Sequence, residues 1–173
     1  PRGEISVLLY NAFIVAALSE EGWKLLLLAR TTWHRPELDE PIDGIVYAVF
    51  VGLGFATVEN ILYVLQLGFS TSLLRALFSV PEHGLLGVVM GYFYAQARFA
   101  PTQGWRMKHL ALALLLPIAL HGSYNFLIFK IASLIDGEAY LLGTLLIVAF
   151  LVLFVALWLV TLRFIRLHTN VSK

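Results

Sequence analysis

Residues 140–162 read YLLGTLLIVAFLVLFVALWLVTL and contain no charged side chain over their whole length. A helix rises 1.5 Å per residue, so about 20 apolar residues cross the hydrocarbon layer of a bilayer, which is about 30 Å thick. A strand of a membrane barrel would alternate apolar and polar residues instead. This stretch is therefore predicted to be a membrane-spanning helix.

Four more apolar runs of similar length precede it, separated by short polar connections. Hydrophobic residues make up 60% of the 173-residue chain and charged residues 13%, with a mean hydropathy of +0.83. In ordinary soluble domains about 45–50% of the residues are hydrophobic and about 25% are charged. A soluble globule of this size cannot bury so much apolar surface. We predict an all-α fold, a polytopic membrane helical bundle of about five transmembrane helices. The predicted spans are residues 5–29, 44–67, 74–97, 110–129 and 140–162.

The composition excludes several classes of protein and orients the bundle. The chain contains no cysteine, which excludes a disulfide scaffold, a thiol enzyme and a thiolate zinc site. A net charge of +1 gives no support for a nucleic-acid partner. The positive-inside rule places the end of the bundle that is richer in Lys and Arg, and with it the C-terminus, in the cytoplasm of a multi-pass cell-membrane protein. The richer end carries Arg30, Arg35, Arg98, Arg106, Lys108, Arg163, Arg166 and Lys173, and the other end carries Arg2, Arg75 and Lys130.

Carboxylate, ammonium, imidazole and amide side chains interrupt the first four predicted spans, whereas the fifth has none of them. A charge at the centre of a bilayer costs at least about 2.5–3.5 kcal/mol and normally faces the bundle interior. At 1.5 Å per residue these groups lie roughly 14–22 Å inside the membrane, so we expect them to line one water-accessible cavity. They are Glu20, Glu21 and Lys24 in the first span, Glu59 and Asn60 in the second, His83 in the third, and His121 and Asn125 in the fourth.

Carboxylates and imidazoles around a buried cavity suit three tasks, which are hydrolysis, ion or proton conduction, and metal binding. Peptide hydrolysis needs a base that activates water, donors for the oxyanion and an acid for the leaving amine. Glutamate beside histidine supplies the base and the acid, and His121 with Asn125 one turn later supplies two donors. Hydrogen bonding between helices is a sufficient role for any single one of these polar groups. It does not explain the whole set, because placing so many polar and charged groups inside the membrane costs free energy that helix packing alone does not require.

The polar residues form four spaced motifs, one in each of four successive spans. They read Glu20-Glu21-x-x-Lys24, Phe55-x-x-x-Glu59-Asn60, His83-x-x-x-Gly87 and His121-x-x-x-Asn125. In this order, and over about residues 12–126, the motifs resemble the PrsW family of bacterial and archaeal intramembrane proteases. That family shares a clan with the CAAX prenyl proteases, whose second motif is Phe-x-x-x-His. Glu59 takes the place of that histidine, which argues against a prenyl-protein substrate.

The resemblance implies proteolysis within the membrane by a single transmembrane protease domain over residues 1–173, and we expect N-terminal spans of the family to lie outside it. The founding member makes the first cut in a membrane-bound anti-sigma factor. The implied partners are therefore a membrane-embedded protein substrate and the lipid bilayer.

From the chemistry of the motif residues we predict a glutamate-dependent endopeptidase that needs no cofactor. The expected catalytic residues are Glu20 or Glu21 as the base that activates water, Glu59 or His83 as its assistant, and His121 with Asn125 as oxyanion donors, with Lys24 and Asn60 in support. One alternative is a zinc enzyme with Glu59, His83 and His121 as ligands. Others are a channel or transporter with a carboxylate proton relay, and a noncatalytic membrane scaffold.

Overall fold

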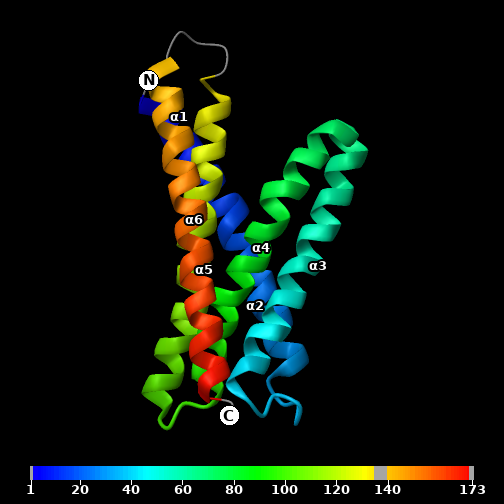
Figure 1. The fold of residues 1–173 in the computed structure, drawn as a ribbon, viewed down its shortest axis with the longest axis vertical. Helices are drawn as coiled ribbons and strands as arrows, with labels where there is room; N and C mark the ends of the chain where they lie inside the picture. Colours follow the sequence, from blue (N-terminus) through cyan, green and yellow to red (C-terminus); the bar gives the residue numbers. More distant parts are fainter. Residues whose placement is uncertain (1, 135–139, 172–173) are drawn as a thin grey trace.

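The computed structural model of the chain describes residues 2–134 and 140–171, and every secondary-structure element within them is helical. The helices form one elongated bundle (Figure 1), which confirms the predicted all-α class. The elements are α1 (Arg2–Leu9), η1 (Tyr10–Leu18), α2 (Ser19–Thr32), α3 (Pro41–Leu67), α4 (Phe69–Arg98), α5 (Gln103–Ala132) and α6 (Tyr140–Val171).

The first predicted span is built from three consecutive helical segments, because the π-helix η1 joins α1 to α2. Directly after η1, the hydroxyl of Ser19 donates to the carbonyl of Val15 at 2.6 Å. Together with this first span, the other long helices match the bundle of about five spans that the sequence predicts. Among the described residues, the helices that are long and apolar enough by themselves to cross a membrane are Pro41–Gln66, Ala76–Arg98, Gln103–Ala132 and Tyr140–Asn170.

Local capping sets where the helices begin. At the start of α3, Pro41 occupies the first turn, and Glu40 forms a capping box with Asp43, whose carboxylate accepts from the Glu40 N–H at 2.8 Å. At the start of α5, the hydroxyl of Thr102 accepts from the backbone N–H of Trp105 at 3.3 Å. Because of this cap, α5 begins two turns earlier than the predicted fourth span.

An ion pair ties the N-terminal end of the first span to α5. The ammonium of Lys130 donates to Oε1 of Glu4 at 2.9 Å. The hydrogen bond and the charge of Lys130 lower the pKa of Glu4 below its usual value. The pair therefore holds α1 against α5 at the end of the bundle opposite the C-terminus (Figure 1).

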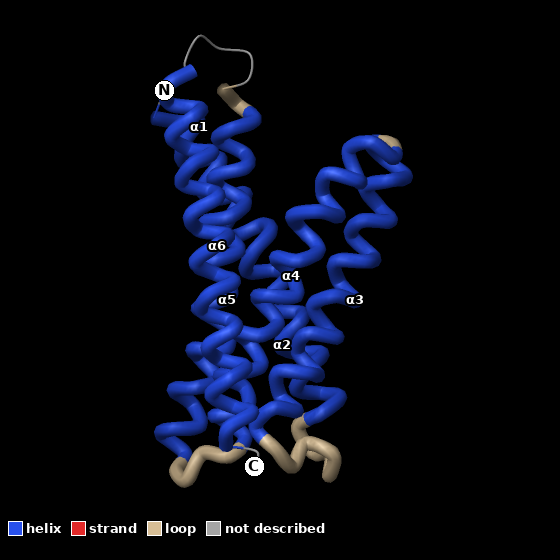
Figure 2. The backbone as a smooth tube through the Cα atoms, viewed as in Figure 1, coloured by secondary structure: helices blue, strands red, loops and turns tan. Residues whose placement is uncertain are grey.

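α4 is the central helix, and α6 lies at the periphery. In the membrane-spanning stretch of α4, 50% of the residues are buried, compared with 11% in that of α6. α6 carries no charged residue in its apolar stretch, so it has nothing that must be turned towards the bundle interior. α3 runs beside α4, and the two lean away from α5 and α6 at one end (Figure 2).

Glycines bring α3 and α4 into close contact. A Cβ atom at Gly87 would lie 2.8 Å from the Cα of Val49 and 2.9 Å from the carbonyl oxygen of Ala48. On the same seam, a Cβ atom at Gly44 would lie 2.8 Å from the Cβ of Ala95. Small residues let membrane helices approach each other in this way. The glycine that ends the third motif is therefore a helix-packing residue.

Gly87→Ala is expected to lower the free energy of unfolding by about 1–3 kcal/mol, because the added methyl group must displace the backbone of α3. The matched control is Gly143→Ala on α6, where a Cβ atom would meet nothing within 4 Å. Unfolding of the purified chain in detergent micelles, followed by circular dichroism, measures both changes. Equal stability of the two variants would show that α3 and α4 are not held at this separation.

Candidate active site

Glu21 lies at the centre of a buried polar cluster between α2 and α5, and none of it is exposed. Its Oε1 accepts two hydrogen bonds, from the ammonium of Lys24 at 2.7 Å and from Nδ1 of His121 at 2.8 Å. Because Nδ1 of His121 carries this proton, the lone pair of the neutral imidazole is on Nε2. This Nε2 lies 4.0 Å from Oε2 of Glu20. Glu21 thus orients His121 towards Glu20.

Lys24 connects the cluster to α4 and, through His83, to α3. Its ammonium lies 2.7 Å from Nδ1 of His83, and an ammonium group can only donate. Nδ1 of His83 therefore accepts, which places the ring proton of the neutral imidazole on Nε2. This proton is donated to Oε2 of Glu59 at 3.1 Å. The rings of His83 and His121 meet edge to face, with centroids 5.4 Å apart.

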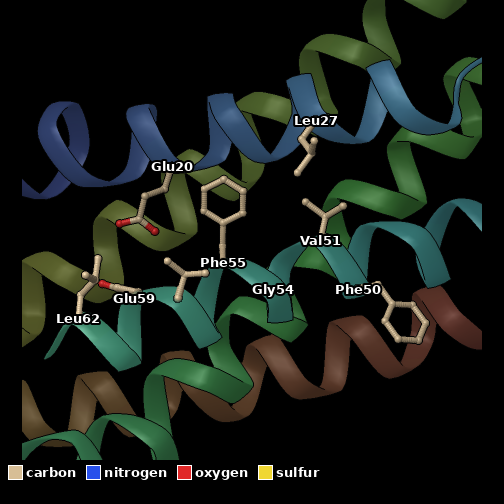
Figure 3. Close-up of a pocket in the computed structure, with 9 residues that line it drawn as sticks. Glu20, Leu27, Phe50, Val51, Gly54, Phe55, Glu59 and Leu62 are labelled. Atoms are coloured by element: carbon tan, nitrogen blue, oxygen red, sulfur yellow. The ribbon is translucent and has the colours of Figure 1, made fainter. Parts of the chain in front are cut away.

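A groove of about 730 Å³ between α2 and α3 ends at this cluster. Glu20 and Glu59 stand at one end of the groove, and the rest of its lining is apolar (Figure 3). About a quarter of each of these two side chains is exposed, 26% for Glu20 and 27% for Glu59, whereas Glu21 and Lys24 are buried. A ligand in the groove can therefore touch Glu20 and Glu59, and the other polar groups act from behind them.

The structure brings together the predicted carboxylates and imidazoles from all four motifs. Adjacent in sequence, Glu20 and Glu21 diverge as their 100° separation on a helix requires, one towards the groove and the other into the bundle. The amides do not join the network. Asn125 is half-buried on α5 and makes no side-chain hydrogen bond among the described residues, and Oδ1 of Asn60 is buried without a hydrogen-bond partner among them. The proposed roles of both amides stay predictions.

Comparison with known proteins identifies the family. Residues 1–159 match the family described as PrsW family intramembrane metalloprotease. The chain belongs to this family. It is similar to Protease PrsW of Clostridioides difficile (strain 630), at 33% identity over 97% of this chain and 68% of the relative. It is also similar to Protease PrsW of Geobacillus kaustophilus (strain HTA426), at 45% identity over 68% of this chain and 52% of the relative, and to that of Bacillus subtilis (strain 168), at 40% over 72% and 56%.

Membership of the PrsW family confirms the resemblance that the four motifs indicate. The chain is a multi-pass membrane protein and an intramembrane protease, which makes it a hydrolase of peptide bonds. No solved structure matches it.

The PrsW family is described as metalloproteases, and the polar cluster offers donors of the kind that bind a metal ion. One ligand atom each from Glu20, His83 and His121 lies within 4.8 Å of the other two. Two imidazoles and one carboxylate are a common protein ligand set for zinc. His121 also has the buried carboxylate of Glu21 on its second nitrogen, the arrangement that orients metal-binding histidines. By donor type and by position, these residues fit a metal.

This ligand set differs by one residue from the zinc alternative that the sequence suggests. Glu20 takes the place of Glu59, because Glu59 hydrogen-bonds to His83 rather than joining the group of three. Both ring nitrogens of His83 have partners, Lys24 on Nδ1 and Glu59 on Nε2. His83 is therefore the ligand that must release a partner before it can hold a metal.

Glu82 is a buried carboxylate to which the sequence assigned no role. It is 1% exposed, neither of its oxygens has a hydrogen-bond partner among the described residues, and its Oε2 lies 4.0 Å from Nε2 of His83. Counted from the predicted start of the third span, Glu82 lies about 12 Å deep, one residue short of His83. α4 begins earlier, at Phe69, because Gly68 turns the chain with a φ of 86°. Glu82 thus lies roughly 20 Å along the helix.

Proposed function

We propose that the chain cleaves membrane-embedded protein substrates inside the bilayer, at the polar cluster beside the groove between α2 and α3. The observation that carries the proposal is the convergence of Glu20, His83 and His121 within 4.8 Å at the end of that groove. The resemblance to the founding member of the family extends the proposed substrate class to membrane-bound anti-sigma factors.

Glu20, His83 and His121 would hold the metal, which when bound supplies Lewis-acid polarisation of the scissile carbonyl and activation of a water molecule. Glu59 stands at the groove with its carboxylate on His83, so it can take the proton of the attacking water and return it to the leaving amine. Glu21 keeps His121 in its orientation through the Nδ1 hydrogen bond, and the charge of Glu21 is balanced by Lys24.

Glu21 is not proposed as the base, because it is fully buried and its Oε1 already accepts two hydrogen bonds. Asn125 remains the proposed oxyanion donor, one helical turn beyond His121 on α5. Asn60 remains a proposed support next to Glu59. The metal-free alternative expected from the sequence makes Glu20 the base, since Glu20 is the carboxylate of the first motif that reaches the groove.

Removal of metal is expected to abolish proteolysis by the chain reconstituted in liposomes with a single-spanning substrate protein. Activity should return when stoichiometric zinc is added after the chelator has been removed. Total metal analysis should find a divalent metal in the wild type and in the control His34→Ala, which changes an exposed loop histidine, but none in His121→Ala. Full activity of a preparation that contains no metal would contradict the metal site and favour Glu20 as the base.

The same liposomes test the proton-conducting alternative. A proton flux that persists in His121→Ala and is independent of any cleavage would favour a channel over a protease. We also propose that the C-terminus is cytoplasmic, which rests on the distribution of Lys and Arg. The connections before α3 and α5 lie at the same end of the bundle as the C-terminus (Figure 2), in agreement with that distribution.

A further inference from the structure

The groove between α2 and α3 extends well beyond the two carboxylates at its end. Along α3 it runs from Leu62 and Glu59 past Gly54 to Phe50, and along α2 from Glu20 to Leu27 (Figure 3). Its flank is open on the outside of the bundle, because Phe50 is 71% exposed. In a membrane-spanning bundle that outside is lipid, so a segment already inside the bilayer can enter the groove sideways.

The part of the groove between Glu59 and Phe50 has the length of a short extended peptide. Glu59 and Phe50 are nine positions apart on α3, which is roughly 13–14 Å at the rise of an α-helix. An extended chain advances about 3.3 Å per residue, so the groove accommodates about four residues on one side of the bond next to Glu59. A substrate that is still helical keeps its peptide groups internally hydrogen-bonded, whereas an extended segment frees them.

The carboxylates distinguish a peptide from a lipid chain as the occupant. Freed backbone N–H groups are costly in hydrocarbon unless they find acceptors. Glu20 and Glu59 offer carboxylate oxygens at the end of an otherwise apolar groove. An acyl chain fills the apolar part equally well, but it has no donor for these oxygens. The combination of apolar walls and two acceptors therefore matches an apolar stretch of polypeptide.

Gly54 leaves an open place in the wall of the groove. A Cβ atom built there would meet nothing within 4 Å, so neither helix contact nor backbone conformation explains a glycine at this position. Gly54 lies five positions from Glu59 along α3, or roughly 7–8 Å, which corresponds to about two residues of an extended substrate. A side chain two residues from the cut would point at this place.

We propose that the groove binds about four residues of the apolar substrate segment in extended form on one side of the cut, and that the space over Gly54 accepts a large apolar side chain about two residues from the scissile bond. This inference rests on the proposed function, because it places the scissile bond at Glu20 and Glu59.

Gly54→Leu tests the specificity part of the proposal. The wild type should prefer Leu or Phe over Ala at one substrate position about two residues from the cut, on one side only. In Gly54→Leu, kcat/KM for the Leu and Phe substrates should fall by about tenfold relative to kcat/KM of the same variant for the Ala substrate, since filling or emptying an apolar pocket changes kcat/KM by about 10–200-fold.

Gly143→Leu on α6 is the matched control, because it makes the same change at a helical glycine with open space around it. It should leave the preference unchanged. If Gly54→Leu slows all substrates alike, or slows none of them, the space over Gly54 does not select a substrate side chain.

A binding experiment separates failure of this inference from failure of the proposed function. The chain has no cysteine, so a single Leu27→Cys variant gives one defined attachment point in the groove. The probe is a membrane-spanning peptide of leucine and alanine in which one cysteine is moved along the apolar segment. Oxidative crosslinking should be strong at a few neighbouring probe positions and weak elsewhere.

Val152→Cys is the control, since Val152 is 63% exposed in an apolar hollow of α6 that carries no carboxylate. Position-dependent crosslinking at Leu27→Cys in a chain that does not cleave the substrate would support the groove and overturn the proposed cleavage at the polar cluster. Cleavage with equal, position-independent crosslinking at both sites would overturn the groove and indicate that lipid occupies it.

Discussion

Glu59→Gln is expected to lower kcat for peptide cleavage by about 10²–10⁴-fold, the usual contribution of a positioned general base. The amide keeps the shape of the side chain and a hydrogen bond to His83, but it cannot take a proton from water. Because Glu59 is not one of the three residues proposed to hold the metal, the variant should contain as much metal as the wild type. Cleavage of a reconstituted single-spanning substrate and total metal analysis measure the two properties on one preparation.

Two further glutamate variants serve as comparisons for the loss of activity in Glu59→Gln. Glu21→Gln should cost only about 10–100-fold, because Glu21 acts through His121 rather than on the substrate. Glu37→Gln, in the exposed connection before α3, should change nothing. If Glu59→Gln cleaves at near wild-type rates across the pH range, Glu59 is only a hydrogen-bond acceptor for His83, and the base is Glu20.

Lys24→Met is expected to lower the free energy of unfolding by about 3–5 kcal/mol, the usual cost of removing one partner of a buried ion pair. The ammonium of Lys24 is 2.7 Å from the fully buried carboxylate of Glu21 and 2.7 Å from His83. Its loss leaves the negative charge of Glu21 with only His121 beside it. Thermal unfolding in detergent micelles, followed by circular dichroism, measures the change.

The double variant Lys24→Met/Glu21→Gln should recover part of this loss, because the uncompensated carboxylate has then been removed as well. Lys108→Met, which changes an exposed lysine of α5, is the control and should be near wild-type stability. Equal stability of Lys24→Met and Lys108→Met would mean that the buried pair contributes nothing to folding.

Most of the fold follows from hydrophobic patterning alone. The bundle of long helices and the peripheral place of α6 both follow from which stretches lack charged residues. Helix ends are harder to predict, because they depend on caps such as Thr102 and on a single turn at Gly68, which apolar patterning does not detect. The π-helix η1 is also invisible in the sequence, since its residues are as apolar as those of an ordinary helix.

Depth in the membrane predicted that the four motifs meet, but not which residues pair within the cluster. Counting residues places Glu20, Glu21 and His121 in one layer, because helical rise is constant. Which of two adjacent glutamates faces His121 depends on the rotation of α2 in the bundle, and that rotation is set by packing against other helices. Glu82 was assigned no role from the sequence for a similar reason, since its depth in the membrane depends on where α4 starts. The groove belongs to two helices at once, so no single stretch of sequence reveals it.

The apolar, open flank of the groove has a consequence for pharmacology. A small molecule that enters from the side of Phe50 comes out of the bilayer rather than out of water, so its concentration in the membrane governs occupancy of the site. Each added methylene group favours transfer into lipid by about 0.8 kcal/mol, roughly a fourfold change in concentration. For an inhibitor with a metal-binding head and an alkyl tail, lengthening the tail raises potency even where the tail makes no new contact with the protein. Structure–activity series against this enzyme therefore have to be corrected for lipid partition before any gain is assigned to the groove.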